Sequence, residues 1–167
     1  GKPDLALVFN EGPDYSAAGV FTRNQVNAAP VLGSTQVMTT GRLRAVILNS
    51  GGANACTGPA GFADTHHTAE AAAEALGIGP IDVAVCSTGL IGERLDMPKL
   101  LAGLRHALAV ADHAGGAAAA EAIMTTDTFP KVATAKAKIG ESEVTINGIA
   151  KGAGMIAPDM ATMLSFV

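Results

Sequence analysis

Three short apolar runs that alternate with alanine-rich stretches constrain the fold of this chain more than any other feature. The runs LALVF (5–9), RAVILN (44–49) and DVAVC (82–86) are rich in branched side chains and are bounded by polar residues or glycines. This pattern is typical of buried β-strands. Weaker alternating patterns at 19–22 and 143–147 predict two further strands.

Alanine-rich stretches predict helices over 64–76, 97–113 and 115–124, because alanine has the highest helix propensity of all residues. Gly115 and Gly116 mark the break between the last two stretches, so we expect a kinked helix or a helix–loop–helix at this junction. Strands that alternate with helices along the chain predict an α/β domain in which helices cover the faces of a sheet.

Three residues mark the expected helix ends. Asp64 and Asp96 stand where an N-cap would be, and a carboxylate there can accept the free N–H groups of the first helical turn. Gly77 follows the first alanine-rich stretch, and glycine readily adopts the left-handed conformation that ends many helices. We therefore expect two N-caps and one C-terminal stop at these positions.

Composition excludes several classes of protein. The 167-residue chain has 49% hydrophobic and 16% charged side chains, which predicts one compact domain or one large piece of a bigger one. Its net charge of −4 offers no basic surface for nucleic acid or an anionic membrane. No apolar run reaches the roughly 18 residues of a membrane helix, and the start lacks a signal-peptide pattern. We expect a soluble cytoplasmic protein.

The cysteines and histidines show no metal-binding pattern. Cys56 and Cys86 lie thirty positions apart without a CxxC motif, so we expect small buried side chains and neither a zinc site nor a disulfide framework. None of the four histidines has a carboxylate or thiol at the sequence spacing that metal ligands show. The histidines are His66, His67, His106 and His113. The sequence therefore predicts no metal site.

Two glycine-containing segments directly follow predicted strands. NSGGANACTG (49–58) could let the backbone approach a ligand or bind an anion, although a purely structural strand-to-helix turn fits equally well. It lacks the lysine of a phosphate-binding P-loop. In CSTGLIG (86–92), the hydroxyl of Thr88 and the amide of Gly89 could donate to one oxyanion. From spacing alone, a simple turn is favoured for this second segment.

The segment GIAKGAGMIAPDMATML (148–164) is atypical of a strand or an amphipathic helix and fits a self-cleaving segment. The hydroxyl of Thr162 could attack the carbonyl of Ala161, and hydrolysis of the resulting ester would leave Thr162 as a new N-terminus. Its α-amine, with a pKa well below that of lysine, could then act as the base for its own hydroxyl. Lys151 is the nearest cation, and Ser165 is the only other hydroxyl nearby. The alternative is a glycine-rich loop that ends a sheet.

At these residues the chain resembles the ornithine acetyltransferase family, usually called ArgJ, the bifunctional glutamate N-acetyltransferase of arginine biosynthesis. The similarity covers nearly the whole chain, in the family's order. Its blocks are FNEGPDYSAAGVFTRNQVNAAPV (9–31), LNSGGANACTG (48–58), VCSTGLIGERL (85–95), EAIMTTDTFPK (121–131) and GIAKGAGMIAPDMATML (148–164).

The resemblance implies roles for individual residues. The precursor would cleave itself between Ala161 and Thr162, Thr162 would then accept the acyl group, and Thr88 and Gly89 would form the oxyanion hole. The implied substrate contacts are Thr125, Thr126, Lys151 and Thr162. The 26-residue spacing to Lys151 favours Thr125 over Thr126 as the threonine that faces the ligand.

The resemblance also implies an activity and an architecture. An acetyl group would move from N2-acetylornithine to Thr162 and on to glutamate, without a metal or an organic cofactor. Acetyl-CoA as a further donor is left open. The implied fold is a two-sheet αββα sandwich of the DmpA/ArgJ-like type, of which this chain is the N-terminal part. Residues 1–161 would be the α chain and 162–167 the start of the β chain, within an α2β2 heterotetramer.

Two other functions are compatible with parts of the pattern. A self-cleaving aminopeptidase of related architecture would share the N-terminal hydroxyl nucleophile but hydrolyse peptides. A non-catalytic α/β binding module would make no use of the cleavage segment. The family precursor is more than twice as long as this chain, and its second chain supplies a catalytic glutamate together with asparagine and threonine contacts. We therefore expect an α chain with its cut site, or an uncleaved precursor fragment.

Overall fold

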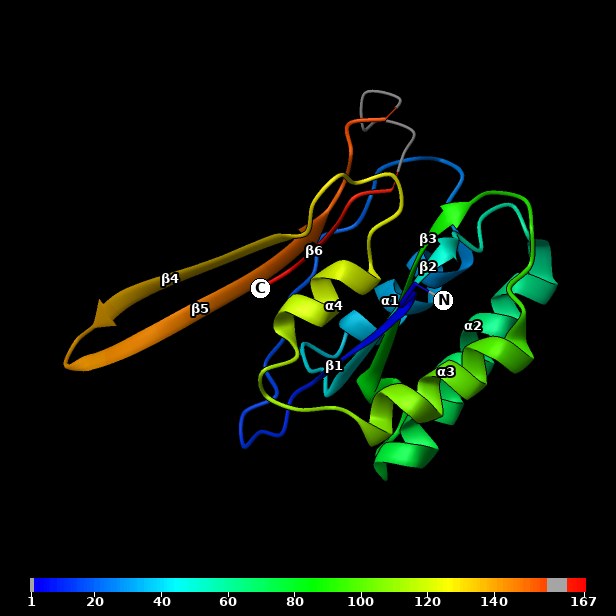
Figure 1. Cartoon of the computed structure of the whole chain (residues 1–167). Helices are drawn as coiled ribbons and strands as arrows, with labels where there is room; N and C mark the ends of the chain where they lie inside the picture. Colours follow the sequence, from blue (N-terminus) through cyan, green and yellow to red (C-terminus); the bar gives the residue numbers. More distant parts are fainter. Residues whose placement is uncertain (1, 156–161) are drawn as a thin grey trace.

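A computed structural model describes residues 2–155 and 162–167 and shows a mixed α/β fold (Figure 1). The elements in chain order are β1 (Leu5–Phe9), α1 (Ala29–Met38), β2 (Ala45–Gly52), α2 (Gly58–Leu76), a short 3₁₀ turn η1 (Pro80–Asp82), β3 (Val83–Leu90), α3 (Met97–Ala109), α4 (Gly116–Ala122), β4 (Lys131–Ile139), β5 (Ser142–Lys151) and β6 (Leu164–Phe166).

Strands β1, β2 and β3 form the first sheet, with β2 in the middle. The strands β1 and β2 are antiparallel, whereas β2 and β3 are parallel. A parallel pair needs a crossover connection, and α2 supplies it between β2 and β3. The register places Ser50 opposite Thr88 and Gly51 opposite Gly89, so the last residues of these two strands meet at one edge of the sheet.

One face of this sheet packs against helices. Side chains from β2 and β3, among them Ile47 and Val85, form a buried cluster with alanines of α2 and with Leu104 of α3. The alanines Ala72 and Ala73 are fully buried, and their small size lets α2 lie close to the strands. This cluster is the larger hydrophobic core of the described residues.

The other face of the first sheet meets α4 and a second sheet. Leu48 of β2 packs with Ile123, at the end of α4, and with Ile149 of β5 and Phe166 of β6. The hydroxyl of Ser50 donates to the carbonyl oxygen of Ala122 at 2.7 Å and ties β2 to α4. The layers therefore follow the order helix, sheet, sheet, which confirms the expected mixed α/β class.

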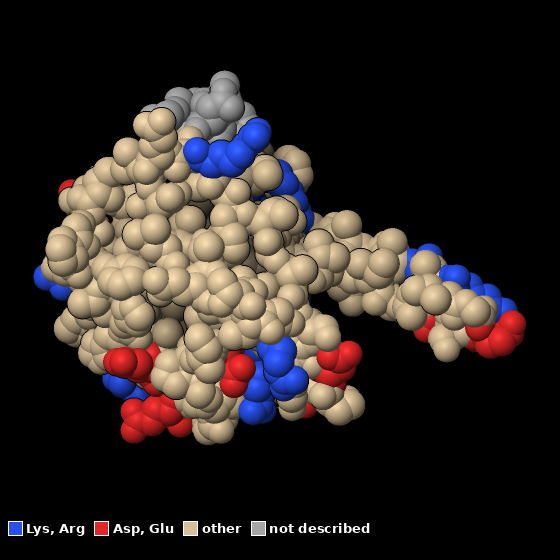
Figure 2. All heavy atoms as spheres, turned by 180° about the vertical axis from the view of Figure 1, so that it is seen from behind, with Lys and Arg blue, Asp and Glu red and all other residues tan. Residues whose placement is uncertain are grey.

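Strands β4, β5 and β6 form the second sheet, which is antiparallel throughout. The hairpin of β4 and β5 extends away from the body (Figures 1 and 2). Figure 2 shows charged side chains gathered at its tip, where Lys136 pairs with Glu143 and Lys138 with Glu141. Only the base of this hairpin, near Lys151, reaches the region between the sheets.

The strongest strand predictions are confirmed, and one weak prediction is wrong. The runs at 5–9, 44–49 and 82–86 correspond to β1, β2 and β3, and 143–147 lies within β5. Residues 19–22 form no strand. Val20 is 99% exposed, and alternation without a neighbouring strand to bond leaves this stretch irregular.

The helix ends correct one expected cap and confirm the others. Helix α2 begins at Gly58, so Asp64 lies inside it and is not an N-cap; its buried carboxylate instead pairs with Arg94 at 2.7 Å. Asp96 caps α3 by accepting the Lys99 N–H at 3.3 Å, and Gly77 ends α2 in the left-handed conformation. The gap between α3 and α4 confirms the helix–loop–helix.

One helix and two strands were not predicted from the sequence. Helix α1 contains Gly33 and Ser34 in its interior, which are poor helix formers, and it is held by tertiary contacts. Ser34 donates to the Val85 carbonyl at 2.7 Å and accepts the Val85 N–H at 3.0 Å. Strands β4 and β6 were also missed, and β5 continues to Lys151, so the segment 148–164 is partly strand, contrary to the expectation.

No helix among the residues that the structure describes is long and apolar enough to cross a membrane.

Gly89 is required by the close approach of β2 and β3. Its φ of +131° lies in a region that side chains disfavour, and a Cβ there would overlap the backbone of Gly51 and Gly52. Gly92, three residues further on, has a φ of +90° but no described atom within 4 Å of its would-be Cβ. Comparing a substitution at Gly89 with one at Gly92 therefore separates the free-energy cost of a steric overlap from that of a positive φ.

We expect Gly89→Ala to destabilise the protein more than Gly92→Ala. Both variants carry the conformational cost of a positive φ, on the order of 1–3 kcal/mol, whereas only Gly89→Ala adds overpacking, about 1–3 kcal/mol. Urea unfolding of the full-length variants measures the difference. Equal unfolding midpoints would show that the contact between Gly89 and Gly51 is unimportant.

Candidate active site

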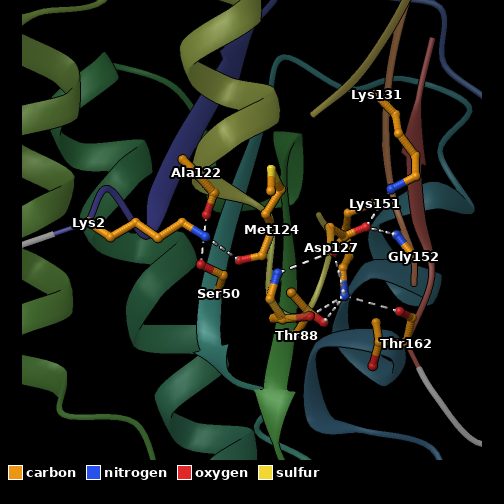
Figure 3. A network of polar contacts seen from close by, with 11 residues as sticks. Lys2, Ser50, Thr88, Ala122, Met124, Asp127, Lys131, Lys151, Gly152 and Thr162 are labelled. Carbon is orange, nitrogen blue, oxygen red and sulfur yellow. Dashed lines mark hydrogen bonds and ion pairs between the residues drawn. The ribbon is translucent and has the colours of Figure 1, made fainter. Parts of the chain in front are cut away.

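Four of the site residues predicted from the sequence converge where the two sheets meet (Figure 3). Thr88 lies near the end of β3, and Lys151 is the last residue of β5. Thr125 lies in the loop between α4 and β4, and Thr162 stands two residues before β6. Four separate segments of the chain thus contribute one side chain or carbonyl group each.

Lys151 holds these residues together. Its Nζ donates to Thr125 Oγ1 at 2.8 Å, to Thr88 Oγ1 at 3.1 Å and to the Thr162 carbonyl oxygen at 3.4 Å. The Lys151 side chain is only 4% exposed, and Thr88 is 1% exposed. An ammonium group has three N–H donors, so each donor has one acceptor in this cluster.

Asp127 is the residue of this cluster that sequence reasoning missed. Its side chain is fully buried, and its Oδ1 accepts from Lys131 Nζ and from the Gly152 N–H, both at 2.7 Å. Its Oδ2 accepts the Thr125 N–H at 3.3 Å and lies 3.9 Å from Lys151 Nζ. The carboxylate therefore joins the loop after α4 to the base of the hairpin of β4 and β5.

The charges in this cluster shift one another's pKa. Burial alone would raise the pKa of Asp127, but hydrogen bonds from Lys131, Gly152 and Thr125 together with the Lys131 charge lower that pKa to about 2. Burial lowers the pKa of Lys151; the Asp127 charge opposes this shift, and the Lys131 charge adds to it. Asp127 is therefore ionised at neutral pH and provides a negative charge beside Lys151.

The segment 49–58 has a structural role in the described chain. Asn54 adopts a φ of +47° and is fully buried. Its Nδ2 donates to the Gly61 carbonyl at 2.8 Å and to Thr65 Oγ1 at 3.0 Å, while its Oδ1 accepts from the Thr57 hydroxyl at 2.7 Å. These bonds fix the first turns of α2, which supports the interpretation as a strand-to-helix turn.

The remaining predicted residues lie at or beside the cluster. Thr125 contacts Lys151 directly, whereas Thr126 is exposed. Gly89 directly follows Thr88 in β3. Thr162 is half-buried, and Ala161 lies outside the described residues. The geometry brings the carbonyl oxygen of Thr162 to Lys151 and leaves the catalytic roles themselves as predictions.

The thiol of Cys86 is not suited to replace a threonine as nucleophile. Burial raises the pKa of the Cys86 thiol to about 12, so this neighbour of the site stays protonated at neutral pH. Cys56 is exposed and Cys86 is only partly buried as a residue, contrary to the expectation that both are buried. Cys56 has a φ of +58°. The left-handed turn that leads into α2 places its side chain outward.

Among the described residues, no group of three or more His, Cys, Asp or Glu side chains is arranged to hold a metal ion. The polar groups of the cluster are instead a lysine, two threonine hydroxyls, a carboxylate and backbone groups. Hydroxyl groups beside an ammonium can bind and polarise a carboxylate or a carbonyl oxygen. This chemistry suits acyl transfer.

The chain spans only about two fifths of the length of the curated relatives it matches. It is 66% identical over 171 residues to a protein of Mycobacterium tuberculosis named arginine biosynthesis bifunctional protein ArgJ, with 98% of this chain and 42% of the relative covered. A protein of the same name from Streptomyces coelicolor is 59% identical over 164 residues, with 98% and 42% covered.

Two solved structures share the fold. The crystal structure of ornithine acetyltransferase from M. tuberculosis, in complex with ornithine, has a TM-score of 0.84 and 61% identity, and the match covers 96% of this chain and 84% of that one. The crystal structure of arginine biosynthesis bifunctional protein ArgJ from Bacillus halodurans has a TM-score of 0.87 and 38% identity, with 98% and 84% covered.

The family model described as the ArgJ family matches residues 1–167, the whole chain. The expected resemblance is thereby confirmed, and the fold agrees with both solved structures. The chain belongs to the ArgJ family.

Proposed function

We propose that the full-length protein carrying this chain is a self-cleaving N-acetyltransferase of arginine biosynthesis. It would move an acetyl group from N2-acetylornithine to glutamate and release ornithine and N-acetylglutamate. The observation that carries this proposal is the contact of one buried ammonium, that of Lys151, with Thr88, Thr125 and Thr162. The names of the relatives and the ornithine bound to the M. tuberculosis enzyme support the choice of substrates.

The first step is cleavage between Ala161 and Thr162. The Thr162 hydroxyl attacks the Ala161 carbonyl carbon, its proton passes to the departing amine, and water then hydrolyses the ester. Residues 1–161 become the α chain and Thr162 the first residue of the β chain. The match covers 42% of the curated M. tuberculosis relative but 84% of the chain in the solved M. tuberculosis structure. The chain in that structure is therefore much shorter than the curated relative, which supports a division of the precursor.

The second step uses the amine that cleavage releases. The α-amine of Thr162 takes the proton of the Thr162 hydroxyl, which attacks the acetyl carbonyl of N2-acetylornithine. Ornithine leaves as an amine with that proton, and an acetyl ester stays on Thr162. The amine of glutamate then attacks this ester and regenerates the hydroxyl. An α-amine has a pKa near 8, which suits a base at neutral pH.

Thr88 and Gly89 act as donors to the oxyanion of both tetrahedral intermediates. Lys151 donates to Thr88 Oγ1, so the Thr88 hydroxyl proton is free to point at the oxyanion. Removing one such donor typically costs about 10²–10³ in rate. The position of Gly89 directly after Thr88, at a strand end, favours a joint role.

Lys151 and Thr125 take part in holding substrate and nucleophile. The Lys151 contact with the Thr162 carbonyl is the longest of its three, so a substrate carboxylate can replace it at the least cost. Thr125 lies against the same ammonium and is the substrate contact we assign, while exposed Thr126 borders it. The Thr162 carbonyl stays with Thr162 after cleavage, so Lys151 can also hold the nucleophile until a substrate carboxylate replaces this contact.

The relatives are named bifunctional, which supports a second activity. We propose that acetyl-CoA also acetylates Thr162, so that the enzyme forms N-acetylglutamate from either donor. The β chain of the same precursor would complete the site within an α2β2 heterotetramer in the cytoplasm. This proposal requires neither nucleic acid nor membrane as a partner.

We expect Thr162→Ala to abolish both cleavage and acetyl transfer, because one hydroxyl performs both attacks. Intact mass spectrometry of the full-length protein reports cleavage. An assay of N-acetylglutamate formation, run separately with N2-acetylornithine and with acetyl-CoA, reports transfer. Ser165→Ala is the matched control, since Ser165 is an exposed hydroxyl three residues away in β6.

An uncut wild-type protein with full activity would contradict the mechanism. If Ser165→Ala lost cleavage and transfer while Thr162→Ala kept both, Thr162 would not be the nucleophile. If N-acetylglutamate formed with N2-acetylornithine as donor but not with acetyl-CoA, the protein would use a single donor. Release of ornithine at the same rate without glutamate would favour hydrolysis over transfer.

A further inference from the structure

Asp127 lies beside the Lys151 ammonium and bonds to the backbone on both sides of the cluster. It accepts the N–H of Gly152, which follows Lys151, and the N–H of Thr125, whose hydroxyl receives a Lys151 hydrogen bond. One carboxylate thus fixes the backbone beside the lysine and the backbone beside one of its acceptors. Figure 3 shows Asp127 between Lys151, Gly152 and Lys131.

The distance between Asp127 and Lys151 defines how they interact. The Oδ2 oxygen lies 3.9 Å from Lys151 Nζ, within ion-pair range but too far for a good hydrogen bond. The three ammonium donors instead reach Thr88, Thr125 and the Thr162 carbonyl. Asp127 therefore compensates the lysine charge without occupying any of its N–H groups.

We propose that Asp127 is a positioning residue that orients the Lys151 ammonium toward Thr88 and Thr125. The inference rests on the function proposed above, since it assigns Asp127 an effect on acetyl transfer that acts through Lys151. A purely structural bridge between the loop after α4 and the hairpin is the competing explanation. The two explanations differ in what happens to Lys151 when the charges around it are changed one at a time.

Removing the Lys131 charge should shift the pKa of Lys151 in the direction opposite to removing the Asp127 charge. The Lys131 Nζ lies 2.7 Å from Asp127 Oδ1, on the hairpin side of the carboxylate. Of the described residues, Asp127 and Lys131 are the charged groups that act on Lys151; the other elements packed against it present Thr88, Thr125 and the Thr162 carbonyl. Asp127 stabilises the protonated lysine, and Lys131 opposes it.

The experiment compares Asp127→Asn, Lys131→Met and Asp64→Asn in the full-length protein. Asp64 is the matched control, because its carboxylate is also buried, at 8% exposed, and paired with Arg94 away from the cluster. The measurements are kcat and KM for acetyl transfer across pH and the titration of Lys151 by carbon NMR of isotope-labelled lysine.

We expect Asp127→Asn to lower kcat/KM about 100-fold, as misplacement of a site group does. The titration of Lys151 and the alkaline limit of kcat should both move to lower pH, because the protonated lysine loses its counter-charge. Lys131→Met should move both to higher pH, because a like charge is removed. Asp64→Asn should lower stability without shifting the titration of Lys151 or the alkaline limit of kcat.

Shifts in the same direction for Asp127→Asn and Lys131→Met would overturn the proposal, since a structural bridge loses its ion pair in both. Equal behaviour of Asp127→Asn and Asp64→Asn would overturn it as well. If Asp127→Asn does not fold, the direction of the Lys131→Met shift decides. Failure of the proposed function would be visible in the wild type as absence of N-acetylglutamate, and the Lys151 titration would still test Asp127.

Discussion

A positive charge buried between two sheets is the constraint on which the site depends. An ammonium removed from water needs an opposite charge and an acceptor for each donor. Asp127 supplies the charge to Lys151, and two threonine hydroxyls and a carbonyl supply the acceptors. Satisfying this one side chain brings β3, the loop after α4, β5 and the segment before β6 to a common point.

The layers around the cluster hold that point in place. The second sheet and α4 pack on one face of the first sheet, where Ile149 and Phe166 pack against the buried cluster that contains Leu48. Thr88 and Lys151 both lie in strands rather than loops, so the hydrogen bonds of the two sheets position the backbone that carries them. Acyl transfer benefits from such preorganised donors, because they need not reorient as charge develops.

Local sequence patterns predicted what depends on local physics. Branched apolar runs identified β1, β2 and β3, and a capping aspartate and a glycine identified two helix ends. Helix α1 was missed because Ser34 is stabilised by Val85, far away in the sequence. Asp127 was missed for the same reason. Its role depends on Lys151 and Gly152, and nothing in the spacing of an isolated aspartate after two threonines indicates such partners.

In the proposed mechanism Thr162, once it is an N-terminus, carries the acetyl group between donor and acceptor. The most direct test incubates the cleaved protein with N2-acetylornithine in the absence of glutamate and maps the β chain by mass spectrometry. We expect one acetyl group, as an ester on the Thr162 side chain, that disappears when glutamate is added. An unmodified Thr162, or an acetyl group on another residue that turns over with glutamate, would contradict the account.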